Sequence, residues 1–275
     1  MIPDFLVIGA SKCGTTYIDA CLREHPEIYV PPMTKEVFYF DKNYHKGINW
    51  YLKHFKYATS QHKVLGECTA SYFHSKECPK RIYQTNPNCK LIISLRDPVE
   101  RCISNYFHKK RYGETNLNFY EALEKIPSLI NESLYFTQLT NFLKYFDKNQ
   151  IYIIIYEDLK SNPEICLRKI YDFLGVDNSF KPQSLYDRFN VRKLPRNYIL
   201  SKLINKLNLY LRSKQQYWLI NFAKKIGFQK IIYTNKAIDF EIDRKWSKYL
   251  YSKFENDIQM LEKYLNRNLY FWKKY

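Results

Sequence analysis

A short apolar run, a turn of small residues and an amphipathic segment open the sequence, and this pattern constrains the fold most. Residues 5–8 read Phe-Leu-Val-Ile, which is typical of a strand buried on both faces of a sheet. A turn bounded by Gly9 and Gly14 follows, and residues 15–24 carry apolar side chains at helical spacing. In this order, backbone N–H groups and the positive end of a helix dipole meet at one point. The pattern predicts a phosphate-binding loop.

A second strand and helix repeat the theme. Leu91–Leu95 is an apolar run, and Arg96 stands at its end. Asp97 occupies the N-cap position of the next segment, with Pro98 and Glu100 at its first and third helical positions. Such a start is typical of a capped helix. Arg96 is therefore predicted at the carboxyl end of a strand, directly before a helix.

Other segments extend an α/β pattern along the chain. Ile151–Ile155 is predicted as a third strand, followed by a helix that includes Ile165–Leu174. Val64–Gly66 is expected to be a short strand before a loop at Glu67–Phe73, and residues 116–146 are expected to form two connecting helices. Strands that alternate with helices predict an α/β protein with a three-layer parallel sheet and a P-loop-like, nucleotide-kinase-like phosphate-binding loop.

The last third of the chain turns basic and then helical. Lys202–Lys225 and Arg244–Leu265 have amphipathic spacing, which predicts a helical C-terminal part. No repeat, low-complexity tract or linker interrupts the 275 residues. One domain spanning residues 1–275 is therefore predicted.

The net charge of the chain limits the class of partner, and its cysteine content indicates the compartment. The chain has 44 Lys+Arg against 27 Asp+Glu, a formal net charge of +17, which favours a nucleotide, an acidic glycan, nucleic acid or a membrane surface. Its seven cysteines are odd in number and form no C-x-x-C pair, so a reducing compartment is expected.

The six histidines form no metal-binding pattern, so no metal is expected. The first apolar run is too short for a signal peptide, and no run of about 18 apolar residues follows, so a cytoplasmic protein without a membrane span is predicted.

The glycine loop departs from the loop of nucleoside triphosphatases. Its frame, Gly9-x4-Gly14, matches theirs, but Thr15 stands where their motif requires lysine. Lys12, inside the loop, can still reach a 5′-phosphate. A P-loop kinase or nucleotidase stays an alternative, as does a plain strand-to-helix turn. A nucleic-acid-binding protein is a third alternative, although the lysines are dispersed rather than clustered on one helix.

Further motifs follow the loop in order. They read Lys35-Glu36-Val-Phe-Tyr-Phe40, Gly66-Glu67-Cys68-Thr69 and Leu95-Arg96-Asp97-Pro98, the last followed by Ser104. With them, the sequence resembles the sulfotransferases that use 3′-phosphoadenosine 5′-phosphosulfate (PAPS), above all the glycosaminoglycan (heparan sulfate-type) enzymes and their bacterial relatives. The resemblance covers about residues 4–112 and continues more loosely to about residue 200. It implies PAPS as the nucleotide co-substrate, its desulfated form PAP as product, no metal, and a saccharide or other hydroxyl or amine as acceptor.

The resemblance also implies which residues bind the donor. Lys12 would neutralise the leaving phosphate as a catalytic and binding group, and its neighbours in the loop would donate hydrogen bonds to the same phosphate. These neighbours are Cys13, Gly14, Thr15 and Thr16. Arg96 and Ser104 resemble the pair that binds the 3′-phosphate, a role for which the planar guanidinium is suited. Salt bridging of Arg96 to a nearby carboxylate is the alternative.

A glutamate before an aromatic segment serves as general base in the glycosaminoglycan enzymes, and Glu36 occupies that place. Beside Lys35, its carboxylate is expected to stay ionised and able to accept a proton. A surface Lys–Glu pair is the alternative. Glu67 is the reserve candidate for the base, and support of the loop is its other expected role. Family members commonly carry a lysine where this chain has Cys68, which is expected to be a buried thiol.

A basic loop near residue 190 resembles the loop that closes over the nucleotide in bacterial sulfotransferases. Its candidates for phosphate contacts are Arg192, Lys193 and Arg196. A solvated basic loop is the alternative for each of them. No cysteine follows Cys166, so no disulfide is expected to hold this loop.

Overall fold

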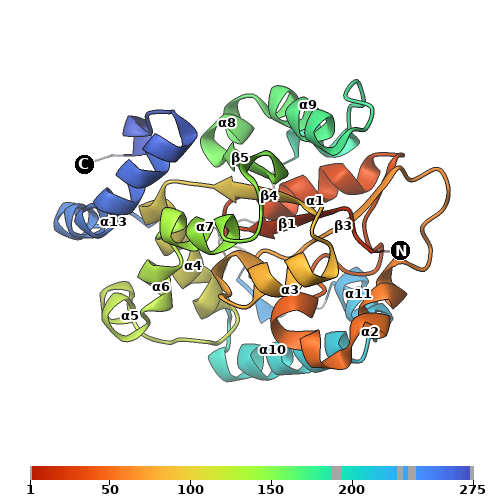
Figure 1. Cartoon of the computed structure of the whole chain (residues 1–275). Helices are drawn as coiled ribbons and strands as arrows, with labels where there is room; N and C mark the ends of the chain where they lie inside the picture. Colours follow the sequence, from red (N-terminus) through yellow and green to blue (C-terminus); the bar gives the residue numbers. More distant parts are fainter. Residues whose placement is uncertain (1, 188–193, 228–231, 235–239, 273–275) are drawn as a thin grey trace. The chain divides into compact units, whose positions relative to one another are not determined.

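The computed structural model describes residues 2–187, 194–227, 232–234 and 240–272. Within these ranges, five parallel strands form one sheet in the order β2-β3-β1-β4-β5 (Figure 1). The strands are β1 (Phe5–Gly9), β2 (Ile28–Tyr29), β3 (Val64–Cys68), β4 (Lys90–Leu95) and β5 (Ile151–Ile155). The predicted parallel α/β fold is therefore confirmed.

The order of the strands gives the loop after β1 a special place. Strand β1 pairs with β3 on one side and with β4 on the other, so Leu6 has Glu67 and Leu91 as its lateral neighbours. The chain first builds β2 and β3 on one side of β1 and then crosses to β4 on the other side. In open parallel sheets, ligands bind beyond the carboxyl ends of the strands where this direction reverses. Residues 9–14 lie at this reversal point.

The chain divides into two compact units, Met1–Arg96 with Thr137–Phe189, and Asp97–Phe136 with Asn190–Tyr275. The first unit contains the sheet. On one face, Phe5 and Val7 join a hydrophobic core with side chains of α1 (Thr15–Glu24) and α9 (Pro163–Leu174). The turn Tyr72–His74 contacts β1, and α3 (Cys78–Thr85) contacts this turn on the other side of the sheet (Figure 1). Helices on both faces of the sheet give the predicted three layers.

Short helices fill the connections of the first unit. Besides α1 and α9 they are α2 (Ile48–Leu52), α3 (Cys78–Thr85), most of α7 (Tyr135–Leu143) and α8 (Tyr156–Ser161), with single turns at Tyr39–Asn43, Tyr44–Lys46, Lys53–Phe55, Tyr72–His74, Lys148–Gln150 and Gln183–Tyr186. Helix α9 ends at Gly175, whose φ of +79° lies in the left-handed region. Glycine adopts this conformation without the penalty that a Cβ atom imposes, which explains the predicted stop.

The second unit is helical. It contains α4 (Pro98–Arg111), α5 (Phe119–Lys125), α6 (Ser128–Asn131), α10 (Tyr198–Ser213), α11 (Tyr217–Lys225) and α13 (Arg244–Leu265). Asp97 caps α4 by accepting the N–H of Val99 at 2.9 Å, and it also accepts the Tyr251 hydroxyl of α13 at 2.7 Å. Arg101 is completely buried and pairs with Glu132 at 3.0 Å. The predicted helical C-terminal part is confirmed.

Several predicted boundaries were wrong. Glu67 and Cys68 belong to β3 rather than to the loop after it. Residues 116–146 form three helices instead of two, because Pro127 disfavours helical conformation at the residue before it. The helix predicted over 202–225 is two helices, which separate where Gln215 adopts a left-handed φ of +59°. The single domain over residues 1–275 stays a prediction.

Candidate functional site

The glycine loop is anchored to the end of β4. The Ser94 hydroxyl donates to the Cys13 carbonyl at 2.6 Å, and the Ala10 N–H donates to the Ser94 carbonyl at 2.8 Å. Lys12 adopts a left-handed φ of +74°, which is uncommon outside glycine. The loop ends at Gly14, the N-cap of α1. Its backbone is thus held in place at the positive end of a ten-residue helix.

Gly14 is required by both its conformation and its surroundings. Its φ is +85°, and a Cβ atom placed there would lie 2.8 Å from the ring of Tyr156. The guanidinium carbon of Arg96 lies 5.1 Å from the centroid of the same ring, a cation–π geometry. Tyr156 thus contacts both the loop and Arg96, two predicted binding elements. Its place directly after β5 is a signal that sequence reasoning passed over.

Lys35 is a second residue that the sequence analysis did not assign to the loop. Its ammonium donates to the hydroxyls of Thr15 at 3.1 Å and Thr16 at 3.3 Å. Both threonines open α1, where the first N–H groups of a helix have no intrahelical acceptor. Lys35 therefore adds a positive charge at the predicted phosphate site. The sequence does not show this contact, because 20 residues separate Lys35 from Thr15 and only the fold brings them together.

The segment before Lys35 is held by α1. Arg23 donates to the carbonyls of Pro31 at 2.5 Å and Thr34 at 3.3 Å, and it pairs with Asp19 at 3.0 Å. Burial raises the pKa of Asp19, against the opposing charges of Arg23 and Lys35. These hydrogen bonds hold the backbone of residues 31–34, and therefore the position at which Lys35 follows.

Glu36 is half-buried, and hydrogen bonds hold the backbone on both sides of it. On its N-terminal side, the Thr34 hydroxyl donates to the Glu36 carbonyl at 3.1 Å. On its C-terminal side, the Val37 N–H donates to the Thr69 hydroxyl at 3.1 Å and to the Glu67 carboxylate at 3.4 Å. The predicted base thus directly follows Lys35, whose ammonium contacts the first two residues of α1.

Glu67 is a completely buried carboxylate within a network of hydroxyls. One of its oxygens accepts from Tyr51 at 2.9 Å and Tyr72 at 2.8 Å, and the other accepts from Thr69 at 2.6 Å. Burial raises the pKa of Glu67 to about 7, although these hydrogen bonds oppose the rise. The Tyr72 hydroxyl also accepts the Tyr39 N–H at 2.8 Å. The network therefore supports the backbone that follows Glu36.

Cys68 is buried, as predicted, and its thiol donates to the Thr15 carbonyl at 3.4 Å. Burial raises the pKa of Cys68 strongly, and the charge of Lys35 opposes this rise only in part. A thiol with a raised pKa is a poor nucleophile. Cys68 therefore packs against the loop, and Lys35 supplies a cation close to it.

Other predicted site residues belong to the second unit. Ser104 is half-buried on α4, and Arg196 is exposed, with its Nε donating to the Tyr233 carbonyl at 3.3 Å. Arg192 and Lys193 lie outside the described residues. Lys12, Cys13, Gly14, Thr15, Thr16, Glu36 and Arg96 all belong to the first unit.

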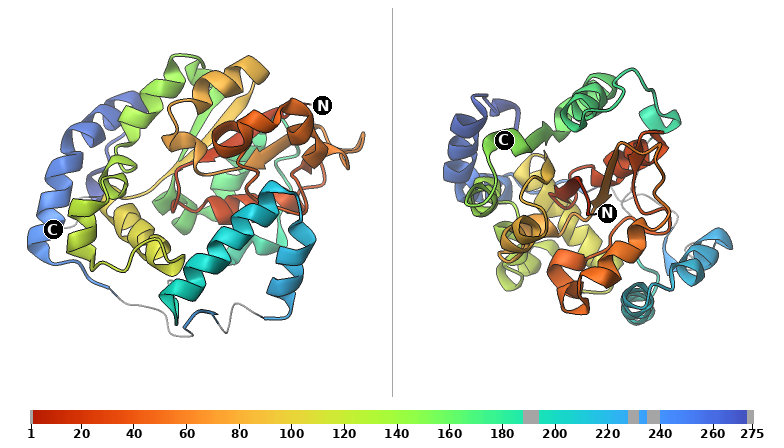
Figure 2. Two further views of the ribbon diagram at one scale, coloured as in Figure 1. Left: turned by 90° about the horizontal axis from the view of Figure 1, so that it is seen from below. Right: turned by 45° about the vertical axis from the view of Figure 1, so that its right-hand side comes forward.

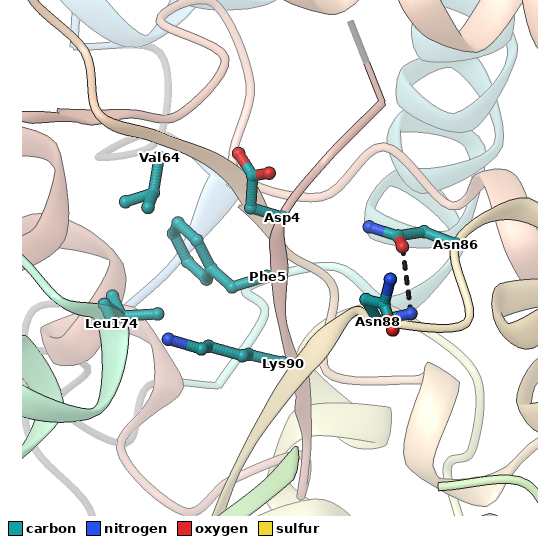
Figure 3. A pocket seen from close by; sticks show the side chains of 7 residues that line it. All are labelled: Asp4, Phe5, Val64, Asn86, Asn88, Lys90 and Leu174. Carbon is teal, nitrogen blue, oxygen red and sulfur yellow. Dashed lines mark hydrogen bonds between the residues drawn. The ribbon is translucent and has the colours of Figure 1, made fainter.

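A pocket in the first unit lies away from this site. Its lining includes Asp4, Phe5, Val64 and Lys90, at the amino ends of three strands (Figure 3). Asp4 accepts the Leu65 N–H at 2.8 Å, and the Lys90 ammonium donates to the Phe173 carbonyl at 2.7 Å. Because parallel sheets bind ligands at the carboxyl ends of strands, this pocket is not the candidate site.

Two features are absent from the described residues. No three His, Cys, Asp or Glu side chains gather there in a group that could hold a metal ion. Across the same ranges, no helix is both long and apolar enough to cross a membrane.

The strand order and the glycine loop between β1 and α1 define an α/β protein of the P-loop-like class. Residues 2–214 match the family described as "Sulfotransferase domain". The chain therefore belongs to the sulfotransferase family.

Relatives from several organisms share this part of the chain. "Membrane-associated sulfotransferase kil1" of Dictyostelium discoideum is 28% identical over 75% of this chain and 65% of its own length. "Bifunctional heparan sulfate N-deacetylase/N-sulfotransferase 4" of Mus musculus is 35% identical over 64% of this chain and 22% of its own length. "Heparan sulfate glucosamine 3-O-sulfotransferase 3A1" of Mus musculus is 32% identical over 70% of this chain and 50% of its own length. The chain thus spans less than two thirds of each of these relatives.

Solved structures share the fold. A sulfotransferase from Alicyclobacillus acidocaldarius has a TM-score of 0.74 at 23% identity and covers 100% of both chains. A retinol dehydratase in complex with androsterone and the inactive cofactor PAP has a TM-score of 0.52 at 12% identity, over 93% of this chain and 80% of that one.

Proposed function

We propose that this protein transfers the sulfuryl group of PAPS to a hydroxyl or amine of a saccharide. The observation that carries the proposal is the contact of Lys35 with Thr15 and Thr16, next to Glu36 in the chain. Because Glu36 directly follows Lys35, this contact supports a proton acceptor near the loop that would hold the leaving phosphate. Family membership supports the reaction type, and the PAP complex of the fold neighbour supports the nucleotide.

The residues of the loop suit a phosphate group. Gly14 lets the loop pack against the Tyr156 ring, and Thr15 and Thr16 begin a helix whose dipole favours an anion. Lys12 and Lys35 would neutralise the charge that develops on the departing phosphate, which is where electrostatic stabilisation lowers a barrier most effectively. Cys13 would contribute its backbone N–H.

The proposed reaction moves one sulfuryl group and one proton. The acceptor oxygen or nitrogen forms a bond to sulfur while the bond between sulfur and the phosphate oxygen breaks, and PAP leaves. Glu36 accepts the proton that the acceptor loses. Transfer in line, with both partners held in position, requires little covalent chemistry from the protein.

The 3′-phosphate is assigned to Arg96 and Ser104, as the resemblance implies. The stacking of Arg96 on Tyr156 supports its part, because it orients the guanidinium beside the loop. Arg192, Lys193 and Arg196 are proposed as further cofactor contacts. A cytoplasmic location and the absence of a metal stay predictions.

An acidic or amino-bearing glycan is the proposed acceptor. Two of the relatives are named as enzymes of heparan sulfate, and one of these carries glucosamine in its name. The net charge of +17 favours the encounter with such an anionic chain.

Calorimetry and an acceptor screen test the proposal. PAP should bind without Mg²⁺, and ATP should not gain affinity when Mg²⁺ is added. Radiolabelled PAPS should then label heparan precursors with free amines or hydroxyls more than glycolipids or small phenols. No binding of PAP would overturn the sulfotransferase proposal, whereas labelling of phenols alone would overturn only the choice of acceptor.

A further inference from the structure

Helices α10 and α11 carry large apolar side chains that are exposed. Ile199, Leu203 and Leu207 lie four residues apart on α10 with exposed fractions of 69%, 58% and 55%. Trp218 and Phe222 lie four residues apart on α11 with exposed fractions of 58% and 59%. The two helices contact each other and are joined by a short turn (Figure 2). Their exposed stripes, Ile199–Leu203–Leu207 and Trp218–Phe222, are called the apolar face below.

The opposite side of α10, which packs on the rest of the second unit, is mixed: it carries the small polar Ser201 as well as the half-buried Ile204 and Leu211. Ser201 is 1% exposed, and its hydroxyl donates to the Arg111 carbonyl at 2.5 Å. Close packing here requires Gly113, because a Cβ atom on it would lie 2.7 Å from the Lys202 backbone. A surface helix of a globular protein normally buries its apolar stripe and exposes its polar side. In α10, Ile199, Leu203 and Leu207 are instead exposed, which indicates a partner for the apolar face.

The charge around the apolar face has one sign. Every charged residue between positions 194 and 227 is Lys or Arg. Lys202 and Lys206 are exposed, and each precedes a leucine of the apolar face in the sequence. A face of Leu, Ile, Phe and Trp bordered by cations has the composition of helices that lie in the interface of an anionic membrane.

We propose that α10 and α11 bind the surface of an anionic lipid bilayer. The apolar face enters the boundary between headgroups and acyl chains, and Lys202 and Lys206 contact the lipid phosphates. Association of two copies through this face is disfavoured, because an interface of two identical faces would bring the same cations together. The inference does not depend on the proposed sulfuryl transfer.

Co-sedimentation of the full chain with vesicles tests the inference. Vesicles of phosphatidylcholine with about 30% phosphatidylglycerol should bind the protein at least about tenfold better than pure phosphatidylcholine at about 0.1 M NaCl. The double substitution Leu203→Gln/Leu207→Gln should lower the partition coefficient by about tenfold. Lys202→Gln/Lys206→Gln should lower binding to the anionic vesicles only.

Matched controls distinguish binding through the apolar face from non-specific binding through other exposed apolar side chains. Ile165→Gln/Met260→Gln removes two exposed apolar side chains elsewhere, 53% and 45% exposed, and should leave binding unchanged. Circular dichroism and the melting temperature show whether each variant folds. In the otherwise intact protein, tryptophan emission should shift to the blue with anionic vesicles, and Trp218→Phe should remove most of the shift.

Three results would overturn the inference. One is equal binding to neutral and anionic vesicles. Another is unchanged vesicle binding by a folded Leu203→Gln/Leu207→Gln variant. The third is a dimer in light scattering that this variant abolishes, without binding of the intact protein to vesicles, which would identify a second copy as the partner.

Discussion

The ammonium of Lys35 lies 3.1 Å from the hydroxyl oxygen of Thr15, at the first residue of α1. This contact links the glycine loop to the segment that carries Glu36. Cys68 donates its thiol to the carbonyl of the same threonine, so Lys35 brings positive charge to a place where this chain has cysteine instead of the family's lysine. Lys35 is therefore the residue best placed to complement Lys12.

Lys35→Ala should lower kcat for sulfuryl transfer by about 10²-fold, because a cation at the departing group is lost in the transition state. The affinity for PAP should fall as well, because PAP keeps the departing phosphate, but by about tenfold and therefore by less than kcat. Single-turnover assays with radiolabelled PAPS and calorimetry with PAP measure the two effects.

Two control variants sharpen the Lys35 prediction. Lys35→Arg keeps the charge and should recover part of kcat, whereas Lys80→Ala removes the charge of an exposed lysine on α3 and should change neither quantity. A Lys35→Ala enzyme that loses PAP affinity and kcat in equal measure would assign this lysine to nucleotide binding instead.

Glu36→Gln should lower turnover by about 10²- to 10⁴-fold, since the amide cannot accept the acceptor's proton. The amide has the same shape as the carboxylate, so PAP affinity and the melting temperature should stay near those of the unsubstituted protein. Turnover of radiolabelled PAPS with a saccharide acceptor provides the measurement. Near-normal turnover of the variant would remove Glu36 from the role of base.

Gly14→Ala should destabilise the protein by about 2–5 kcal/mol, the sum of a left-handed conformation for alanine and a clash with Tyr156. It should also weaken PAP binding. Gly175→Ala is the matched control, because its φ of +79° is similar to the +85° of Gly14 but no atom lies within 4 Å of its Cβ position. Urea unfolding should give about 1–2 kcal/mol for this control and no loss of PAP affinity. Equal losses for both variants would show that the Tyr156 contact contributes nothing.

The pH dependence of stability should reveal Glu67. Burial raises its pKa from 4.5 to about 7, so between these values the folded state binds a proton that the unfolded state has lost. The free energy of unfolding must then fall as pH rises from about 4.5 to 7, by about 3 kcal/mol from this group alone. Glu67→Gln should remove this contribution. Urea unfolding of both proteins across this range measures the contribution. If the free energy of unfolding changes with pH equally in both proteins, the raised pKa is contradicted.

Much of the fold could be predicted because its signals are local. The apolar run of β1, the two glycines and the spacing of α1 lie within consecutive residues, and the helix appeared with the predicted bounds. Strand β2 escaped prediction because two residues carry no periodicity. The division between α10 and α11 escaped it because the apolar spacing continues across the turn at Gln215.

The candidate site was predictable only as a set of separate motifs. Lys12, Glu36 and Arg96 were assigned from their motifs, while Lys35 and Tyr156 became visible only through their contacts with the loop. The sequence shows a glutamate at position 67 but not its four hydrogen-bond donors, which come from segments up to 30 residues away.

The sequence by itself determined the class of the fold, the phosphate-loop frame and the family resemblance, because strand runs, helix spacing and glycine positions act between neighbours in the chain. The tertiary structure alone decided which side chains meet. The order of the strands brings Ser94 to Cys13 and Tyr156 to Gly14, across 81 and 142 residues of chain. Burial on the finished sheet, rather than any local pattern, raises the pKa of Glu67, because the carboxylate loses its solvation only when the layers close over it.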